Sequence, residues 1–414
     1  MVEIALLGHG VVGSGVVEVL TQNCESIANR AKEEIDIKYI LDKREFKDIP
    51  YANKFTKDYN KILNDNDVKI VVEVMGGISP AFEYVKEALL KGKSVVTSNK
   101  ELVAEKGYEL LKIANQKNVN FLFEASVGGG IPIIMPINQC LAANEVIEIA
   151  GILNGTTNFI LTKMIRENMA FDEALKMAQE LGYAERDPSA DIDGEDACRK
   201  ICILASLAYG KHVYPKDVHT IGIRNITLKD VEYAKSYDCV IKLIGQVKKL
   251  DDGKLEIEVE PMFVRNDSQL SGVEDVFNGI LVKGDSTGDV VFYGKGAGKL
   301  PTASAVVADI IDCIKHFDAK KYLSWGSADE QYVKDYIEYK AQFYIRVIAE
   351  DKNRAIKELE AKFPISRFIN ICKPDNSEFA FITKEMQVSE IDDIVNSLLE
   401  KRIKVISKIR VGDF

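Results

Sequence analysis

The sequence has little of the residue types that mark several large classes of protein. Seven cysteines in 414 residues, an odd number, do not form a complete disulfide framework, and none of them lies in a CxxC pair. No apolar run approaches the roughly 18–20 residues of a membrane span. The 54 Lys and Arg residues are outnumbered by 64 Asp and Glu residues, and no basic stripe offsets this excess. We therefore expect a protein of the reducing cytoplasm with no nucleic-acid and no membrane partner.

The proportions of hydrophobic and charged residues are those of an ordinary globular protein. Hydrophobic residues make up 46% and charged residues 29% of the chain, which is enough apolar material for more than one core. At roughly 150 residues per domain, the length favours two or three domains. The first residues form a short apolar run that a glycine ends, which is typical of a strand and not of a secretory signal.

Three patterns of secondary structure follow one another along the chain. Through residue 130 we expect strands at 4–7, 35–41, 69–75, 94–97 and 120–124 and helices at 11–31, 80–91 and 104–117. This alternation predicts an α/β fold with a parallel sheet and right-handed crossovers. Beyond it, helices at 132–142, 156–168, 171–181, 194–209 and 302–316 and antiparallel strands near 240–250, 255–263 and 279–293 indicate an α+β domain. From about residue 335 a small βαββαβ pattern is expected, with strands at 341–349, 365–372, 379–383 and 405–411 and helices at 353–362 and 389–399.

A glycine-rich loop directly follows the first expected strand and opens a helix. It has the sequence Gly8-His9-Gly10-Val11-Val12-Gly13. Gly8 permits the tight turn, Gly10 lets the backbone approach a pyrophosphate, and Gly13 permits close helix–sheet packing. The helix N-terminus supplies free N–H groups for the phosphates. Strand, loop, helix and second strand are all present, so the loop predicts dinucleotide binding.

The choice between NAD and NADP stays open at this stage. The second strand ends at Leu41, and Asp42 after it would favour the ribose 2′-OH of NAD. Lys43 and Arg44 would favour the 2′-phosphate of NADP. His9 lies at the phosphate end of the loop, so we expect it to pack or to face solvent and to take no part in catalysis.

Residues 182–200 concentrate acidic side chains in front of a helix. A calcium loop aligned on Gly194 fails, because its twelfth position is Lys200 and not a bidentate glutamate. Asp196 and Lys200 are four residues apart and therefore share one helix face. We expect Glu185, Asp187 and Asp191 in the preceding loop to converge on a cation such as an ammonium group, and the lysine to hold a hydroxyl or carbonyl or to donate a proton.

Three further segments are rich in groups that can face a ligand. Thr97-Ser98-Asn99-Lys100 follows the fourth strand, at the sheet edge where ligands of open α/β folds bind. Asn154-Gly155-Thr156-Thr157-Asn158 opens a helix with small polar groups. The segment 124–132 begins with Glu124 and contains three consecutive glycines, which free backbone groups to face a ligand or an ion.

In their order and spacing, these segments resemble the homoserine dehydrogenase family. The resemblance covers GHGVVGSGVV at 8–17, TSNKELVA at 97–104, EASVGGGIPII at 124–134, GILNGTTNFIL at 151–161, LGYAERDPSADIDGEDACRK at 181–200 and YGKGAGKLPTASAVVADI at 293–310. It implies NAD(P)-dependent interconversion of L-aspartate 4-semialdehyde and L-homoserine, in threonine and methionine biosynthesis. It also implies a Rossmann-type NAD(P)-binding domain at 1–131, with helix 302–318 packed back on it. Residues 132–301 would form the catalytic and oligomerisation domain of a homodimer or homotetramer.

The same resemblance assigns roles to individual residues. Lys200 would be the acid/base lysine and Lys100 the second lysine at the reacting oxygen, while Glu185, Asp191, Asp196 and Thr156 would bind the substrate. Gly182, Gly298, Thr97 and Lys100 would approach the cofactor with the glycine loop. Glu124, with the backbone of Val127, Gly129 and Ile131, would form a monovalent cation site, usually for sodium. Hydride transfer belongs to the cofactor, and the two lysines would stabilise the developing alkoxide and protonate it.

The C-terminal segment at 335–414 resembles an ACT regulatory domain, which has a ferredoxin-like fold and binds an amino-acid effector. The family loop usually has the sequence Asp-Lys-Pro-Gly, whereas this chain has Asp351-Lys352-Asn353-Arg354. Arg354 adds bulk where close backbone approach is expected. We therefore predict weak or absent inhibition by threonine.

Two rival functions can be weighed from the residues. A phosphorylating aldehyde dehydrogenase needs a thiolate beside a base, and Cys140 and Cys198 lie in helical patterns without a partnered histidine. A non-catalytic NAD(P)-binding sensor would not need the set formed by Lys100, Glu185, Asp196 and Lys200. Both rivals are therefore disfavoured.

Overall fold

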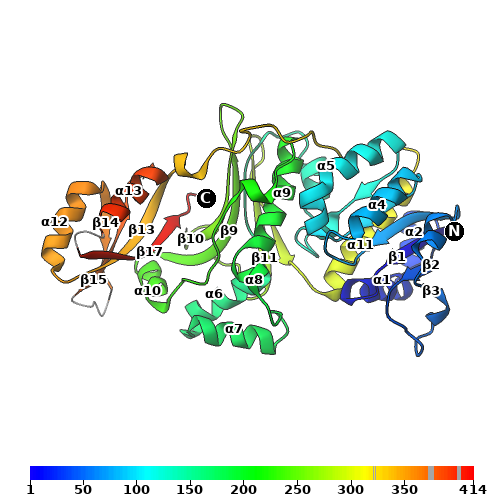
Figure 1. Cartoon of the computed structure of the whole chain (residues 1–414), viewed down its shortest axis with the longest axis horizontal. Helices are drawn as coiled ribbons and strands as arrows, with labels where there is room; N and C mark the ends of the chain where they lie inside the picture. The colour runs from blue at the N-terminus through cyan, green and yellow to red at the C-terminus, as the bar shows by residue number, and fades with distance from the viewer. Residues whose placement is uncertain (320, 322, 372–376, 399–401) are drawn as a thin grey trace.

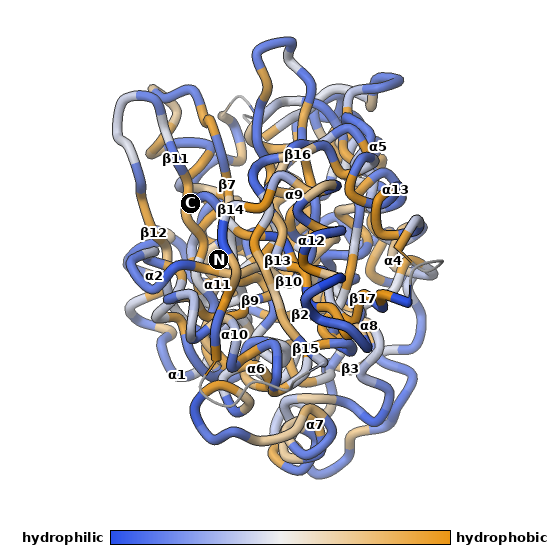
Figure 2. Tube along the Cα trace, turned by 90° about the vertical axis from the view of Figure 1, so that its left-hand side faces the viewer, coloured by the Kyte–Doolittle hydropathy of each residue, from blue (hydrophilic) through white to orange (hydrophobic). Residues whose placement is uncertain are grey.

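The computed structural model describes residues 1–319, 321, 323–371, 377–398 and 402–414, which form an elongated molecule built on two β-sheets (Figure 1). The N-terminal sheet lies at one end, and the sheet of the C-terminal segment lies at the other. In the tube of Figure 2, hydrophobic stretches run along strands, helices alternate between hydrophobic and hydrophilic residues, and many loops are hydrophilic. The described residues contain no helix that is long and apolar enough to cross a membrane.

The first sheet consists of six parallel strands in the order β3-β2-β1-β4-β5-β6. Its strands are β1 (Val2–Leu7), β2 (Ile35–Leu41), β3 (Phe55–Thr56), β4 (Val68–Glu73), β5 (Ser94–Thr97) and β6 (Phe121–Leu122). They alternate with α1 (Val11–Gln22), α2 (Cys24–Ala31), η1 (Ala52–Lys54), α3 (Tyr59–Leu63), α4 (Ala81–Leu90) and α5 (Lys100–Lys117). The predicted parallel α/β sheet is thus confirmed, and the order reverses between β1 and β4, where open α/β folds bind ligands.

Two helices of this sheet differ from the expected bounds. The helix expected at 11–31 is broken at Asn23, which ends α1 and caps α2, so two shorter helices cover the sheet. The helix expected from residue 104 begins at Lys100, because the Asn99 side chain accepts a hydrogen bond from Leu102 N and caps it.

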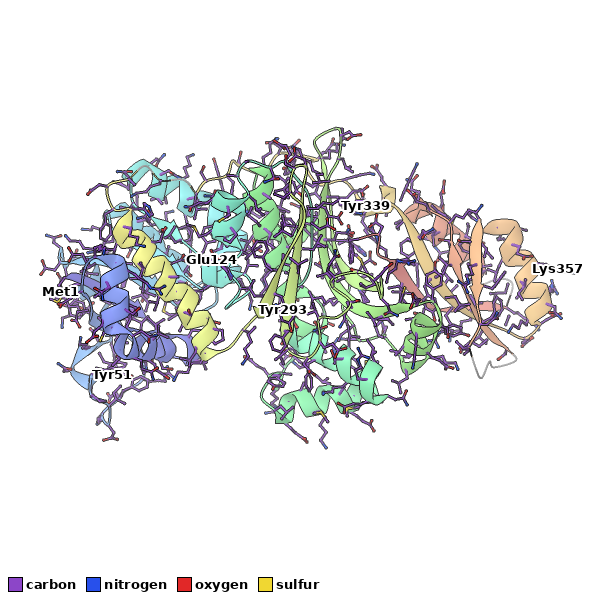
Figure 3. The ribbon with its side chains drawn as sticks, turned by 180° about the vertical axis from the view of Figure 1, so that it is seen from behind. Met1, Tyr51, Glu124, Tyr293, Tyr339 and Lys357 are labelled. Carbon is purple, nitrogen blue, oxygen red and sulfur yellow. The ribbon has the colours of Figure 1, made fainter. Side chains whose placement is uncertain are left out.

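The second sheet is mixed and follows the order β12-β11-β7-β9-β10-β17-β13-β15-β14, with β8 paired to β10 and β16 to β13. Its central strands are β7 (Val146–Ile152), β8 (His219–Thr220), β9 (Cys239–Lys249), β10 (Leu255–Arg265), β11 (Phe277–Gly284) and β12 (Gly288–Lys295). The helices beside them are η2 (Glu124–Ser126), η3 (Pro136–Cys140), α6 (Gly155–Glu167), α7 (Phe171–Glu180), α8 (Ser189–Ile192), α9 (Glu195–Tyr209), η4 (Pro215–Asp217) and α10 (Leu228–Ser236). The helix α11 (Lys299–Lys315) then returns to pack against α1 of the first sheet (Figure 3).

The central part departs from the sequence prediction at several places. Helix α10 was not expected, and the segment expected at 279–293 is a hairpin of β11 and β12. Strand β7 was not expected, although it lies inside the sheet between β11 and β9. The helix expected at 132–142 is reduced to the single π-helical turn η3. Pro132 and Pro136 supply no N–H groups, and the N–H groups between them bind the Glu124 carboxylate instead of continuing a helix.

The C-terminal segment has the expected βαββαβ order. It consists of η5 (Tyr336–Glu338), β13 (Lys340–Ala349), α12 (Lys352–Lys362), β14 (Ile365–Ile369), β15 (Glu378–Thr383), β16 (Met386–Gln387), α13 (Val388–Leu398) and β17 (Ile403–Val411). The end of the strand predicted to Cys372 and of the helix predicted to residue 399 lie outside the described residues. Its four long strands lie in the order β17-β13-β15-β14, which is the ferredoxin-like arrangement.

The C-terminal strands continue the central sheet, which the sequence patterns do not indicate. Strand β17 pairs in parallel with β10 through Met262 opposite Arg410 and Phe263 opposite Val411. The Arg410 guanidinium lies 2.9 Å from a Glu258 carboxylate oxygen, and both side chains are buried. A buried contact between a carboxyl and a guanidinium group therefore crosses the junction of the two units.

The segment that leads to the C-terminal unit is anchored by Trp325, the single tryptophan of the chain. Its indole packs edge-to-face on Phe123 and donates a hydrogen bond to His212 Nδ1 at 3.0 Å. A Cβ at Gly107 of α5 would lie 2.6 Å from the indole ring. The indole therefore lies directly against the backbone of the helix that Lys100 begins.

Candidate active site

The glycine loop has the backbone geometry that a bound dinucleotide needs. Gly8 has φ +100°, a left-handed conformation that favours glycine. A Cβ at Gly13 would lie 2.2 Å from the Gly8 carbonyl oxygen, so only glycine lets α1 approach the strand this closely. A Cβ at Gly10, by contrast, would contact nothing within 4 Å. Gly10, Val11 and Val12 therefore open α1 toward the crevice, where a pyrophosphate would meet free N–H groups.

At the end of β2, the side chains of Asp42 and Arg44 form a closed pair. Both carboxylate oxygens of Asp42 accept bonds from Arg44, one from Nε at 3.0 Å and the other from Nη2 at 2.8 Å. His9 N also donates to Asp42, and Arg44 Nη2 donates to the His9 carbonyl. Arg44 lowers the pKa of Asp42 well below its usual range. These residues line a cleft of about 510 Å³ that reaches from the glycine loop to Lys57 and Tyr84.

His9 has a structural environment, as the sequence indicates. Its imidazole Nε2 lies 3.1 Å from the Tyr51 hydroxyl, and the ring packs edge-to-face on Phe46 and Phe55. Burial lowers its pKa. The aromatic cluster under the loop therefore supports the turn and leaves the phosphate side to backbone groups.

The chemistry-bearing groups meet around one buried carboxylate, that of Asp196 on α9. Lys100 Nζ lies 2.7 Å from Asp196 Oδ1, and Lys200 Nζ lies 2.7 Å from Asp196 Oδ2. Lys200 Nζ also donates to the Leu153 carbonyl oxygen at 2.7 Å. Lys200 and Asp196 are buried, whereas the Lys100 side chain is 40% exposed. Lys100 begins α5 under the first sheet, so two units of the fold contribute to this cluster.

Asp191 joins the cluster through Asn154, which sequence analysis did not single out as a site residue. Asn154 Nδ2 donates to Asp191 Oδ1 at 2.7 Å and to Asp196 Oδ2 at 2.8 Å. The Asn154 Oδ1 accepts from Thr157 N and thereby caps α6. The signal in the sequence was the NGTTN segment itself, because an asparagine before a helical pattern is a preferred N-cap.

Burial and neighbouring charges give these groups unequal pKa values. Burial lowers the pKa of Lys200, although Asp196 opposes this shift. Asp196 raises the pKa of Lys100, which burial opposes. Burial also opposes ionisation of Asp196, but Lys200 and Lys100 outweigh it and hold its pKa below the usual range. Burial, and then the Asp196 charge, raise the pKa of Asp191. Lys200 is thus a buried lysine with a lowered pKa, which gives up its proton more readily than an exposed lysine and is suited to proton transfer.

The remaining expected substrate residues lie around this cluster without joining it. Thr156 is buried, and its hydroxyl donates to the Tyr183 carbonyl oxygen at 2.7 Å. The side chains of Glu185 and Asp187 are exposed, and Asp187 accepts bonds from Ser189. Gly182 precedes them with φ +74° and open space on its Cβ side. The structure therefore brings Asp191 to the lysines but leaves Glu185 at the rim.

Thr97 is held by a buried acid that sequence analysis missed. The Thr97 hydroxyl donates to Glu73 Oε2 at 2.6 Å, and the N–H groups of Met75 and Gly76 donate to Glu73 Oε1. Burial raises the pKa of Glu73. Glu73 ends β4, so its carboxylate ties together the loops after β4 and β5 beside the crevice. Gly298, with φ +123°, is the N-cap residue of α11.

Glu124 lies at the junction of the first sheet and the central unit, where Figure 3 labels it. Its carboxylate accepts bonds from the N–H groups of Ile133, Ile134 and Met135 at 2.6–2.9 Å. Gly128 and Gly129 turn the chain next to it with φ +73° and +53°. No group of three or more His, Cys, Asp or Glu side chains suited to a metal occurs among the described residues.

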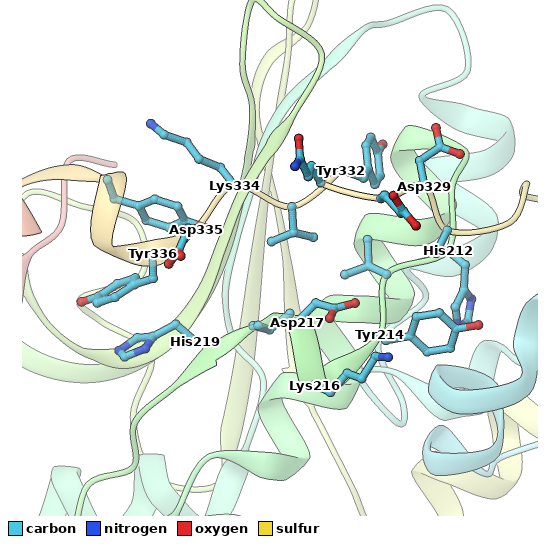
Figure 4. A pocket seen from close by; sticks show the side chains of 17 residues that line it. His212, Tyr214, Lys216, Asp217, His219, Asp329, Tyr332, Lys334, Asp335 and Tyr336 are labelled. Carbon is cyan, nitrogen blue, oxygen red and sulfur yellow. The ribbon is translucent and has the colours of Figure 1, made fainter. Parts of the chain in front are cut away.

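A second cleft, of about 660 Å³, lies between the loop 212–219 and the connecting segment 328–336 (Figure 4). In it the His219 ring stacks on Tyr336 with 3.5 Å between the ring centroids. Burial lowers the pKa of His219 to about 4. Figure 4 shows positively and negatively charged side chains along the cleft. None of the residues that line it belongs to the cluster of Lys100, Asp196 and Lys200.

A parallel sheet with this glycine loop is suited to a nicotinamide dinucleotide, and lysines around a buried acid are suited to a carbonyl that gains hydride and a proton. The molecule is therefore an NAD(P)-dependent oxidoreductase. The family model described as homoserine dehydrogenase, NAD binding domain, matches residues 8–124, and the one described as homoserine dehydrogenase matches residues 132–311. The chain belongs to the homoserine dehydrogenase family.

Individual relatives agree with the family models. The chain is 46% identical to a homoserine dehydrogenase of Synechocystis over 76% of its length and 73% of the relative's. It is 34% identical to one of Bacillus subtilis, with 99% of this chain and 97% of the relative covered. A crystal structure of a Thiobacillus denitrificans homoserine dehydrogenase matches with a TM-score of 0.91 and 33% identity, over 100% of this chain and 98% of that one. The predicted homoserine dehydrogenase function is thereby confirmed.

Proposed function

We propose that Lys200 and Lys100 hold the reacting oxygen during reduction of L-aspartate 4-semialdehyde to L-homoserine, and that Lys200 supplies the proton. When bound, the nicotinamide supplies the hydride that adds to the aldehyde carbon. The carbonyl oxygen then becomes an alkoxide, which two ammonium groups stabilise. Lys200 transfers its proton to this oxygen, and the product is the neutral alcohol. The observation that carries the proposal is that both lysines reach the single buried carboxylate of Asp196.

The substrate's ammonium group would bind to Asp191, with Glu185 at the rim of the site. Both oxygens of Asp196 already bind lysines, whereas Asp191 has no lysine within ion-pair distance among the described residues. Thr156 would position this side of the site through its bond to the Tyr183 carbonyl. An anionic residue beside two cations favours a substrate that carries an ammonium group a short distance from its aldehyde.

The cofactor would be NADP in preference to NAD. The Asp42 carboxylate, the expected acceptor for a ribose 2′-OH, is already bound by Arg44 and His9 N. Arg44, Lys43 and Lys57 all line the same cleft and would attract a 2′-phosphate. The structure of a hyperthermophilic archaeal homoserine dehydrogenase in complex with NADPH matches 75% of this chain and 97% of that one, with 29% identity and a TM-score of 0.64.

Gly8, Gly10, Gly13, Gly182 and Gly298 would let the chain approach the cofactor closely, with Thr97 and Lys100 at its nicotinamide end. A monovalent cation, sodium, would bind at the main-chain carbonyls of Glu124, Val127, Gly129 and Ile131. This fits the local geometry, because three N–H groups already bind the Glu124 carboxylate and two glycines turn the neighbouring carbonyls.

The chain would act as a homodimer or homotetramer in the cytoplasm. Exposed apolar side chains on the central sheet support assembly, among them Ile147, Val291 and Tyr293. Figure 3 labels Tyr293. The cysteines of the described residues are free thiols, which supports a reducing compartment.

The C-terminal unit would be an ACT-type domain for an amino-acid effector that responds weakly or not at all to threonine. Asp351 caps α12 by accepting from Arg354 N, and the Arg354 side chain is 78% exposed over a cleft of about 380 Å³. Arg354→Gly is expected to strengthen inhibition by threonine, measured as the concentration that halves the rate. Strong inhibition of the unaltered enzyme would contradict this expectation.

The activity is tested by following NADPH and NADH absorbance with aspartate semialdehyde. The unaltered enzyme should turn over without added phosphate, and Lys200→Ala should lower kcat by about 10²–10⁴-fold while NADPH binding, measured by fluorescence, stays within threefold. Lys249→Ala, at an exposed ion pair with Glu145, is the matched control. Near-normal turnover of Lys200→Ala would reject the proposed roles.

A further inference from the structure

The side chain of Asn154 links the start of α6 to both carboxylates of the site. Its amide Nδ2 donates to Asp191 at 2.7 Å and to Asp196 at 2.8 Å. Its Oδ1 accepts from Thr157 N at 2.8 Å and from the Thr157 hydroxyl at 3.1 Å. The side chain is buried, and all of its hydrogen-bonding capacity is used inside the protein.

The residue before it binds the catalytic lysine. The Leu153 carbonyl oxygen accepts from Lys200 Nζ at 2.7 Å. Two consecutive residues at the end of β7 therefore fix Lys200, its partner Asp196 and the neighbouring Asp191 relative to one another.

The two carboxylates depend on Asn154 to different degrees. Asp196 also binds Lys100 and Lys200, so it keeps strong partners without the amide. In the described part of the chain, Asn154 is the single hydrogen-bond donor to the Asp191 side chain. The charged groups that face Asp191 are Asp196, Lys200 and Lys100. Nearby Arg224 pairs instead with Asp193, on the outer side of α8.

We propose that Asn154 is a positioning residue that holds the Asp191 carboxylate aimed at the substrate's ammonium group, at a fixed distance from Asp196. This inference rests on the role of Asp191 in the proposed function. The amide N–H groups separate two buried acids that would otherwise repel each other or share a proton. Without the amide, Asp191 is free to turn away, and its affinity for an ammonium group falls.

A purely structural role for Asn154, as the cap of α6, makes a different prediction. Asn, Asp and Ser cap helices about equally well. Asn154→Ser and Asn154→Asp therefore both keep an acceptor for Thr157 N. The aspartate side chain has no N–H group to donate, and the serine hydroxyl has one hydrogen on a shorter side chain, so neither variant can bond both carboxylates as the amide does. The aspartate variant in addition places a third negative charge between them.

The test compares steady-state kinetics of the full-length enzyme with aspartate semialdehyde and NADPH. Losing a hydrogen bond to a charged group costs about 10- to 100-fold, so the semialdehyde KM of Asn154→Ser should rise by that factor. Its melting temperature and its KM for NADPH should stay close to those of the unaltered enzyme. Asn154→Asp should raise the semialdehyde KM further.

The pH dependence of kcat/KM distinguishes the positioning role from a helix cap, because the loss of a cap alone would not change it. Donation by Asn154 lowers the pKa of Asp191, against burial and the Asp196 charge, which raise it. Removing the donor raises the pKa, so the acid limb of kcat/KM for the semialdehyde should move to higher pH in Asn154→Ser. Asn144→Ser is the control, because Asn144 bonds only to backbone groups of Leu141 and Thr287, outside the site.

A double-mutant cycle with Asp191→Asn separates the possible failures. If Asn154 acts through Asp191, then Asn154→Ser should add less than threefold to the KM of Asp191→Asn. An unchanged KM in Asp191→Asn itself would reject the proposed role of Asp191. A raised KM in Asp191→Asn, with an unchanged KM and acid limb in both Asn154 variants, would overturn the positioning role alone.

Discussion

Lys100 and Lys200 bind the two oxygens of the same carboxylate, that of Asp196, from helices that belong to different units of the fold. Both Nζ–Oδ distances are 2.7 Å. Asp196 therefore sets the distance between the two cations before any substrate arrives.

The substitution Asp196→Asn should lower kcat for aldehyde reduction by about 10²–10⁴-fold, the usual contribution of a positioned acid. Asp196 raises the pKa of both lysines, so its loss lowers their pKa values. In the proposed mechanism Lys200 donates a proton during reduction, so the basic limb of the rate profile should move to lower pH. Rates measured across the pH range test this, with Glu109→Gln at the exposed pair with Lys86 as control. An unmoved basic limb would contradict the assignment.

Substitution by alanine should lower the stability of the protein at one glycine of the cofactor loop and leave it unchanged at another. In Gly13→Ala the new Cβ lies 2.2 Å from the Gly8 carbonyl oxygen, so the helix must shift at a cost of about 1–3 kcal/mol or more. In Gly10→Ala the Cβ meets nothing, and the melting temperature should be unchanged while NADPH binding weakens. Thermal unfolding and NADPH titration measure the two effects, and equal stability losses would be inconsistent with the described geometry.

The contact between Asp42 and Arg44 leads to a prediction about the preference for NADPH over NADH. Arg44→Ala should raise the KM for NADPH by about 10- to 100-fold, as expected for a lost bond to a charged group. The KM for NADH should change by less than threefold or fall, because Asp42 becomes free to bind the ribose. KM values measured in parallel with NADPH and with NADH test this prediction. An equal loss for both would mean that Arg44 only supports the loop through the His9 carbonyl.

The buried pair between Glu258 and Arg410 should make stability depend on pH. Burial raises the pKa of Glu258 to about 8, whereas in the unfolded chain it is about 4.3. The folded state therefore holds an extra proton between these values, and its free energy of unfolding falls as pH rises toward 8. Glu258→Gln should remove this loss, which amounts to at most about 1.4 kcal/mol per pH unit.

Calorimetric melting temperatures between pH 6 and about pH 8.5, the range around that pKa, test the prediction, with Glu145→Gln at an exposed pair as control. Parallel pH curves for the unaltered enzyme and Glu258→Gln would show that the carboxyl stays ionised throughout. A separate variant, Arg410→Met, should destabilise the junction by about 1–3 kcal/mol, because the buried Glu258 carboxyl loses its guanidinium partner.

Local signals predicted the elements well, and long-range pairings account for the misses. The strands at 35–41 and 94–97 were predicted with the bounds that the structure shows. Charged residues flank the alternating apolar residues of the first, and Gly92 precedes the short apolar run of the second. Strand β7 was missed, since a short apolar run between helical patterns has no local mark of its pairing with β9 and β11. The parallel contact of β17 with β10 joins residues about 150 positions apart, which no local pattern records.

In the candidate site, too, local spacing predicted some residues, and residues that depend on long-range contacts were missed. The four-residue spacing of Asp196 and Lys200 placed them on one helix face, and the resemblance added Lys100. Glu73 and Asn154 were missed as site residues, because their partners Thr97, Asp191 and Asp196 are more than 20 positions away. The acidic loop was expected to act as one cluster, but only Asp191 turns inward.

The single tryptophan gives this enzyme a built-in optical probe. Trp325 emits from a pocket formed by α5, Phe123 and His212, on the segment that connects the catalytic part to the C-terminal unit. Any movement of that segment that withdraws the indole from its packing would expose it to water and shift its emission to longer wavelength. Unlabelled protein can therefore report, in a stopped-flow mixing experiment, whether an amino acid bound at one end of the molecule is sensed next to the helix that carries Lys100.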